Sequence, residues 1–219
     1  MKLKKVLAAT LAATMVMSSA VTVSASGSNI SDPGTSSSES SSSDSSSSSE
    51  VTYAESMSKA AGASMSIAGT SVKTTVAGVY AAEKVQGVAV TTPIASVKAS
   101  LGLTGSQTPA IIIYDTDVTK SYLAMECVNA AAGAFGGTVI TALNIDLGAR
   151  ENGKWVTLAG GSVGLVSGLP KDADLNKEYC AICVQPGGKV TILEDQDSNP
   201  ATITFAVQAG LGTYAITAK

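Results

Sequence analysis

Apolar and polar positions after residue 51 alternate over short runs, which is the pattern of β-strands with one buried face. The clearest run is 143–147, where apolar and polar side chains take turns along the chain. Asn152 and Gly153 follow, a pair that favours a tight hairpin turn, and 155–158 is the predicted partner strand. The other predicted strands are 64–67, 71–76, 85–90, 110–114, 178–184, 189–193, 201–207 and 213–216.

Two helices are predicted between these strands. Thr92 is the expected N-cap of the first, with Pro93 as its first helical residue, and this helix runs to about residue 101. Asp117 is the expected cap of the second, which covers about 118–134 and ends at the glycine pair 136–137. The predicted buried face of the second helix consists of Leu123, Cys127, Ala131 and Ala134.

The arrangement of these elements predicts an α+β, β-rich fold. Short strands separated by glycine turns predict an antiparallel β-sandwich-like C-terminal part. The mixture of strands and helices before it predicts a small mixed α/β N-terminal part. Residues 51–219 are long enough for a single globular domain with its own core, and 136 is the candidate sub-boundary within it.

Residues 1–25 have the pattern of a cleaved secretory signal peptide. Lys2, Lys4 and Lys5 precede an apolar run over 6–17, which is shorter than the ~20 residues that span a bilayer. The run ends in small residues, and cleavage is expected after Ala25. This pattern predicts a secreted, extracellular protein that is free or associated with the cell surface, and it is typical of Gram-positive bacteria.

Residues 26–50 form a serine-rich segment, with twelve serines in 36–49 interrupted only by Glu39 and Asp44. Such a segment has nothing apolar to bury against the entropy of ordering its backbone, so a disordered linker is predicted. Two interpretations stay open for it, a spacer or carrier of O-linked sugars and a plain unstructured tail.

A resemblance to a known group of proteins lies in the C-terminal strands. The segments 184–190, 193–205 and 210–216 resemble the C-terminal β-module of secreted clostridial surface proteins. In that module a glycine-turned hairpin precedes a threonine-rich strand and a final Tyr-Ala strand. The resemblance implies a β-sandwich and an extracellular location, and it assigns no functional residues.

Composition excludes several classes of function. The chain contains no histidine, which excludes Ser-His-Asp and Cys-His triads in their usual form and the common histidine zinc sites. Its net charge is −3 and its lysines are scattered, so no nucleic-acid partner and no anionic membrane surface are expected. No cofactor and no membrane span beyond the signal peptide are expected either.

Three cysteines, Cys127, Cys180 and Cys183, raise the question of redox chemistry. Cys180 and Cys183 have the spacing of a redox motif but lie within a predicted strand. Residues i and i+3 of a strand point to opposite faces about 10 Å apart, beyond the ~7 Å that a disulfide spans. The two are therefore predicted to be core residues, while the oxidation state of all three and a bridge from Cys127 stay open.

The strongest catalytic signal is an Asp-x-Asp-x-Thr sequence at the end of the predicted strand 110–114. It resembles the first motif of haloacid-dehalogenase-type phosphatases, and this resemblance implies Asp115 as nucleophile, Asp117 as acid-base and a magnesium ion. That family needs a parallel sheet and later lysine and acidic motifs, whereas this chain continues with antiparallel strand patterns. The preferred interpretation is a strand end followed by an aspartate helix cap.

Asp195, Asp197 and Asn199 have the spacing of EF-hand calcium ligands. Pro200 stands where that loop needs glycine, and Ala206 stands where the bidentate glutamate belongs, so an EF-hand is excluded. A weak calcium site in an irregular loop and a solvated acidic turn between strands remain as the two alternatives.

These observations predict a secreted or surface-associated non-enzymatic protein, acting as a binding, adhesion or structural module. Its expected partner is a surface protein or a glycan. The alternatives are a secreted magnesium-dependent phosphohydrolase using Asp115 and Asp117, and a carbohydrate-binding module. For the last of these, Trp155 is the candidate sugar platform, although burial against an opposing sheet fits that residue equally well.

Overall fold

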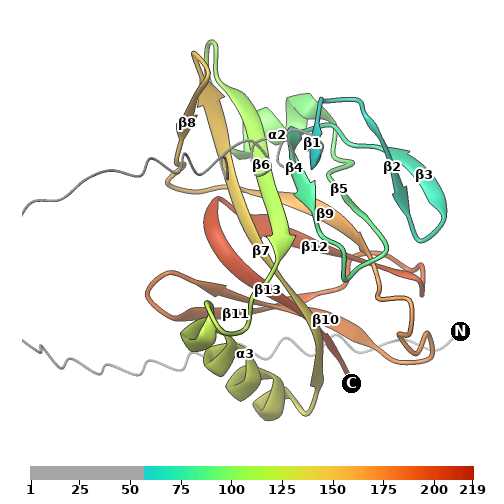
Figure 1. The fold of residues 1–219 in the computed structure, drawn as a ribbon. Helices are drawn as coiled ribbons and strands as arrows, with labels where there is room; N and C mark the ends of the chain where they lie inside the picture. The colour runs from blue at the N-terminus through green and yellow to red at the C-terminus, as the bar shows by residue number, and fades with distance from the viewer. Residues whose placement is uncertain (1–56) are drawn as a thin grey trace, which may run out of the picture. The chain divides into compact units, whose positions relative to one another are not determined.

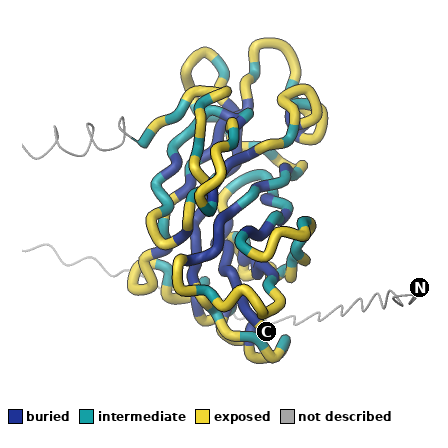
Figure 2. Tube along the Cα trace, turned by 90° about the vertical axis from the view of Figure 1, so that its right-hand side faces the viewer, coloured by how far each residue is buried: buried dark blue, intermediate teal, exposed yellow. Residues whose placement is uncertain are grey.

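Strands dominate residues 57–219, the part of the chain that the computed structural model describes (Figure 1). The predicted signal peptide 1–25 and the predicted linker 26–50 lie outside the described residues and stay predictions. Buried positions follow the strands, whereas exposed positions gather in the connecting loops (Figure 2). The prediction of a β-rich fold is confirmed.

The larger of three sheets has eight strands in the order β1-β4-β6-β7-β13-β10-β11, with β8 paired to β7. Only β4 and β6 run parallel, and every other neighbouring pair in this sheet is antiparallel. The strands are β1 (Ser58–Lys59), β4 (Ala77–Ala81), β6 (Thr108–Asp115), β7 (Thr138–Glu151), β8 (Lys154–Val156), β10 (Tyr179–Gln185), β11 (Lys189–Glu194) and β13 (Gly210–Ala218).

The remaining strands form a three-stranded sheet and a hairpin. The three-stranded sheet has the order β12-β9-β5, and β2 forms an antiparallel hairpin with β3 around Gly69. Two α-helices, α2 and α3, complete the elements described here. The bounds are β2 (Ser64–Ile67), β3 (Thr70–Lys73), β5 (Val88–Ala89), α2 (Ile94–Ser100), α3 (Tyr122–Phe135), β9 (Ser162–Gly168) and β12 (Thr202–Gln208).

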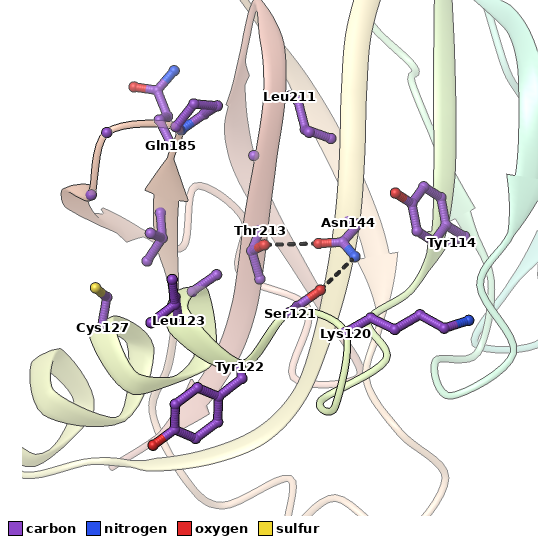
Figure 3. A pocket seen from close by; sticks show the side chains of 16 residues that line it. Tyr114, Lys120, Ser121, Tyr122, Leu123, Cys127, Asn144, Gln185, Leu211 and Thr213 are labelled. Atoms are coloured by element: carbon purple, nitrogen blue, oxygen red, sulfur yellow. Dashed lines mark hydrogen bonds between the residues drawn. The ribbon is translucent and has the colours of Figure 1, made fainter. Parts of the chain in front are cut away.

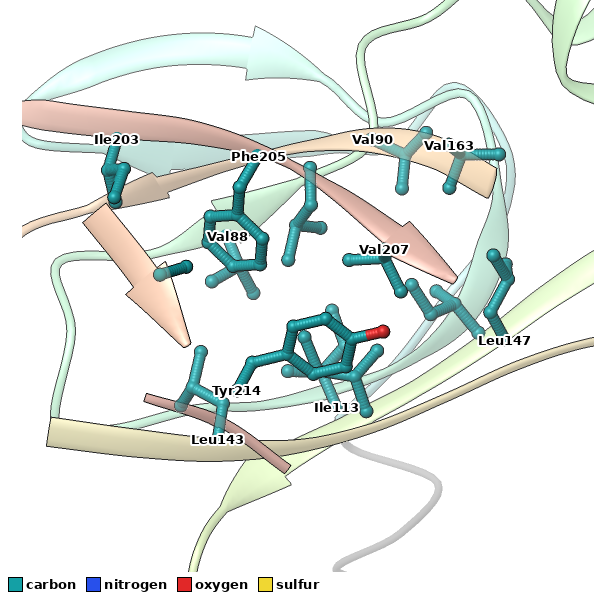
Figure 4. Close-up of a cluster of buried hydrophobic side chains, with 14 of the residues drawn as sticks. Val88, Val90, Ile113, Leu143, Leu147, Val163, Ile203, Phe205, Val207 and Tyr214 are labelled. Carbon is teal, nitrogen blue, oxygen red and sulfur yellow. The ribbon is translucent and has the colours of Figure 1, made fainter. Parts of the chain in front are cut away.

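The main core lies between the larger sheet and the three-stranded sheet (Figure 4). Alternate residues of β7 are fully buried there, as the predicted strand 143–147 requires. The predicted inward face of β12, Ile203, Phe205 and Val207, is fully buried too, and Phe205 stacks on Tyr214 with 5.7 Å between ring centroids. Each such side chain contributes roughly 1.5–3 kcal/mol by leaving water.

A second, smaller core lies on the other face of the larger sheet, under α3. Met125, Val128 and Ala132 of the helix pack on Ala142, Ile182, Val184 and Ala215 of the strands. We call this side of the sheet the outer face. Because α3 contacts only part of it, the outer face near β6 and the start of β13 carries no helix.

The predicted buried face of α3 is wrong. Leu123 is 78% exposed, Ala134 is exposed, and Cys127 and Ala131 are half-buried. The helix also begins at Tyr122 instead of 118, because residues 118–121 form a separate turn. Alanine-rich helices have several faces of similar hydrophobicity, and the neighbouring sheet residues decide which one is buried. The predicted end is confirmed: Gly136 adopts φ +76 and closes the helix.

Three smaller boundary predictions are also corrected. Pro93 takes an extended conformation with ψ 137, so it is the cap of α2 and Thr92 lies one residue before it. The predicted strand 85–90 is reduced to β5, which spans two residues. The last predicted strand, 213–216, is longer than expected: residues 210–212 already belong to β13, where Gly212 leaves room for the ring of Tyr214.

The chain on both sides of position 136 contributes to one sheet and one core. β6 and β7 pair over eight residues, from Thr108 opposite Arg150 to Asp115 opposite Leu143. The main core includes residues from Val76 to Ile216. The predicted hairpin at Asn152 and Gly153 is confirmed between β7 and β8. No helix within 57–219 combines the length and hydropathy needed to cross a bilayer.

Candidate functional site

A groove of about 660 Å³ opens on the outer face of the larger sheet, beside the start of α3 (Figure 3). Five parts of the chain line it: Tyr114 at the end of β6, residues 120–124 with Cys127 at the start of α3, Asn144 on β7, the β10–β11 turn at 184–188, and residues 211–213 on β13. Its volume falls within the range of about 300–1,000 Å³ that small-molecule sites occupy in proteins.

Local structure explains why this part of the outer face stays open. The turn before α3 delays the helix until Tyr122, so its first residues stand at the border of the groove and do not cross it. On the opposite side, Gly187 and Gly188 both have positive φ, at +86 and +78, which turns β10 tightly into β11 without adding side chains to the wall.

Three uncharged polar side chains form a row on the floor of the groove (Figure 3). The Thr213 hydroxyl donates to Asn144 Oδ1 at 2.7 Å, and Asn144 Nδ2 donates to Ser121 Oγ at 3.4 Å. Asn144 and Thr213 are only 8% and 7% exposed. Buried amide and hydroxyl groups with fixed partners are a common basis for orienting a polar ligand.

Apolar side chains with large exposed areas surround this polar row. Tyr122 and Leu123 at the start of α3 are 58% and 78% exposed, and Tyr114 and Leu211 are 42% and 47% exposed. Single exposed apolar residues are ordinary, but four around one groove form a patch of the kind found at binding sites. The site therefore combines an apolar rim with a polar floor.

The groove carries little charge. Lys120 is the single charged residue in its lining, and its ammonium lies 3.6 Å from the Asp117 carboxylate in an exposed pair that contributes little stability. Asp146 lies two residues beyond Asn144 on β7, with Ile112 and Leu211 as its cross-strand neighbours. Partial burial raises the pKa of the Asp146 carboxyl above its ordinary value.

Asp115 and Asp117 lie at the end of β6, and both carboxylates accept backbone hydrogen bonds. Asp115 accepts from the N–H groups of Glu83 and Lys84, at 2.8 and 3.2 Å, which ties β6 to the loop after β4. Asp117 Oδ1 accepts from the N–H groups of Lys120 and Thr119, at 3.3 and 2.9 Å. These bonds, that of Lys120 first, lower the pKa of Asp117. Asp117 therefore caps the separate turn at 118–121, whereas α3, the helix it was predicted to cap, begins one turn later.

Asp195, Asp197 and Asn199 form a series of turns that their own side chains hold together. Asp195 Oδ1 accepts from the N–H groups of Asp197 and Thr204, at 3.1 and 2.9 Å. Asp197 Oδ2 accepts from the hydroxyl groups of Thr202 and Thr204, at 3.1 and 2.7 Å. These carboxylates fasten the turn to the start of β12. Within 57–219, no three His, Cys, Asp or Glu side chains are grouped to hold a metal ion.

Cys180 and Cys183 are free, buried and on opposite faces of β10, which confirms the prediction that they are core residues. Cys183 belongs to the main core beside Tyr214, and burial raises the pKa of both thiols. Cys127 is also free and half-buried, and it lies in the lining of the groove.

Trp155 is half-buried, so its environment is intermediate between the exposed sugar platform and the buried core position considered for it. Its ring lies over Gly148 on β7, where a Cβ atom would be 2.6 Å from the nearest ring carbon. It is not part of the groove lining. The groove is lined instead by residues that include Tyr114, Tyr122 and Asn144. No local sequence pattern predicts these residues as a site, because they come together only through the pairing of β6 with β7 and the placement of α3.

Comparison of the chain with protein-family models, curated proteins and solved structures returns no match.

Proposed function

We propose that this chain is a secreted or cell-surface-associated, non-enzymatic binding module, and that it binds its partner in the groove on the outer face of the larger sheet. The observation that carries this proposal is the combination of an open groove, a polar floor and an apolar rim. The signal-peptide pattern, the serine-rich segment and the resemblance to clostridial surface proteins supply the proposed extracellular setting. We further propose that the two sheets that enclose the main core form a β-sandwich.

The engagement of Asp115 and Asp117 favours a binding module over a phosphohydrolase. A nucleophilic carboxylate needs a free oxygen directed at its substrate, whereas each oxygen of Asp115 already accepts a backbone N–H. The test is phosphate release from a phosphoester panel, with and without magnesium. Magnesium-dependent turnover that is lost in Asp115→Asn would overturn the non-enzymatic assignment.

Binding itself is tested with isolated Gram-positive cell walls and the purified full chain. We expect saturable binding that Leu123→Asp abolishes, because the change places a charge on the exposed rim. An acidic residue in the first turn of a helix is favourable, so this variant should remain folded. Leu175→Asp is the matched control, since Leu175 is 50% exposed and is not part of the groove lining. Absence of saturable binding, or equal binding by both variants, contradicts the proposal.

A further inference from the structure

The geometry of the groove points to a chemical class of ligand, and we propose that it binds a single sugar ring, the terminal pyranose of a glycan. This inference rests on the proposed function and names the ligand of the same groove. Four features carry it: unused hydrogen-bonding capacity on the floor, an aromatic ring beside it, low charge and suitable size.

The polar row retains both donors and acceptors. An asparagine amide has two N–H donors, and Asn144 uses one of them on Ser121. The Ser121 hydroxyl accepts that bond and has its own proton left to donate, while the Thr213 hydroxyl donates to Asn144 and has its lone pairs left to accept. A row of side chains that can both donate and accept hydrogen bonds is complementary to the neighbouring hydroxyl groups of a sugar, because each hydroxyl can also do both.

Backbone donors at the start of α3 add to this capacity. Ser121 occupies the N-cap position, but its side chain makes no capping hydrogen bond. Among the hydrogen bonds of 57–219, none involves the N–H groups of residues 122–124, all of which line the groove. Helix-start N–H groups need an acceptor, and sugar ring and hydroxyl oxygens supply one without requiring a charge.

Tyr114 from β6 lies beside the polar row, where it pairs across the strands with Asn144, whereas the ring of Tyr122 from α3 points away from the row (Figure 3). Tyr114 is 42% exposed, so its ring is available to a ligand. A pyranose has polar edges and an apolar face of C–H groups, and that face packs on aromatic rings. The arrangement therefore matches both surfaces of a sugar ring, whereas an extended peptide would need apolar pockets in place of the polar row.

The charge and dimensions of the groove fit the same ligand. Lys120 is paired with Asp117, and its ammonium points away from the polar row (Figure 3). A volume of about 660 Å³ that opens to solvent leaves room for the rest of a glycan to continue beyond the bound ring. Neutral and acidic sugars share this ring chemistry, so both belong in the test.

The experiment is a glycan array of neutral and acidic terminal sugars probed with the purified full chain. The best monosaccharide is then titrated calorimetrically. We expect saturation with a Kd of about 1 mM or tighter. Tyr114→Ala should weaken binding by about fivefold or more through loss of ring contact. Thr213→Val keeps the shape of the side chain, removes its hydroxyl and should weaken binding similarly.

Matched controls separate the groove from general effects of substitution. Val118→Ala changes a residue that is 56% exposed just before α3, and Thr191→Val changes a threonine of β11; neither residue lines the groove. Both controls should bind sugar as the unmodified chain does. Thermal unfolding of each variant shows whether it is folded, and Tyr114→Ala, a change of an exposed side chain, keeps the test valid if Thr213→Val does not fold.

Two outcomes overturn the inference. If no sugar binds while cell-wall binding persists and is lost in Leu123→Asp, the ligand class is wrong and the proposed binding function stands. If sugar binding is unchanged in both Tyr114→Ala and Thr213→Val, the sugar site lies elsewhere on the protein. Binding that is confined to acidic sugars and weakened in both variants would support the groove as the sugar site. The negative charge of the sugar would then lie at the start of α3.

Discussion

Tyr80 illustrates at the scale of one residue how the main core handles a polar group. Its side chain is 6% exposed, its hydroxyl donates to the Val76 carbonyl at 2.8 Å, and it lies 2.7 Å from the Thr74 hydroxyl. Burial raises the pKa of Tyr80 to about 12. Because the unfolded chain loses this proton near pH 10, the stabilisation is complete below that pH and falls as the pH rises towards 12.

We therefore expect the free energy of unfolding to fall between about pH 10 and about pH 12, with Tyr80 contributing at most ~1.4 kcal/mol per pH unit. Urea unfolding across this range measures the slope, and Tyr80→Phe should reduce it. Tyr214, whose pKa burial also raises, remains in that variant and leaves part of the slope. Tyr122→Phe, a change at an exposed ring, is the control. Equal slopes for all three chains would show that Tyr80 is not the titrating group.

At the scale of elements, the acidic turn between β11 and β12 holds the start of β12 in place through side-chain hydrogen bonds. Asp195 accepts two N–H groups that are partly buried, so Asp195→Ala should lower the free energy of unfolding by about 1–2 kcal/mol. Ser198→Ala, an exposed neighbour in the same turn, should have little effect. Denaturant unfolding of both variants measures the difference.

The same hydrogen bonds predict the response of this turn to calcium. Because Asp195 and Asp197 already accept from backbone and threonine groups, we expect calcium chloride to leave the thermal midpoint unchanged. A midpoint that rises with calcium, and stops rising in Asp195→Ala, would restore the calcium alternative raised by the spacing of these residues.

Elements with a local signal could be predicted from the sequence, and elements positioned by distant contacts could not. The hairpin at Asn152 and Gly153 has its turn chemistry within two residues, and the inward face of β12 follows from strict alternation. The buried face of α3 depends on Ala142, Ile182 and Ala215 from three strands. The groove depends in the same way on Ser121, Asn144 and Thr213, which are far apart in the sequence.

At the scale of the whole molecule, one sheet and one core join the chain on both sides of position 136. Residues 57–219 should therefore unfold in a single transition, with far-ultraviolet circular dichroism and Trp155 fluorescence changing together. Phe205→Ala removes a fully buried ring and should lower the free energy of unfolding by about 3–5 kcal/mol in both signals. Two separate transitions, only one of which responds to Phe205→Ala, would indicate two independent units.

The place of β13 in the larger sheet sets the order in which a newly made chain can acquire its structure. β13 comes after all the other strands in the sequence, yet it lies between β7 and β10 and is the only link between them in that sheet. Until residues 210–218 have left the ribosome, β7 and β10 each present an unpaired edge, of the kind that recruits other chains into aggregates. The larger sheet can therefore close only after residues 210–218 have been made, however early its other strands appear.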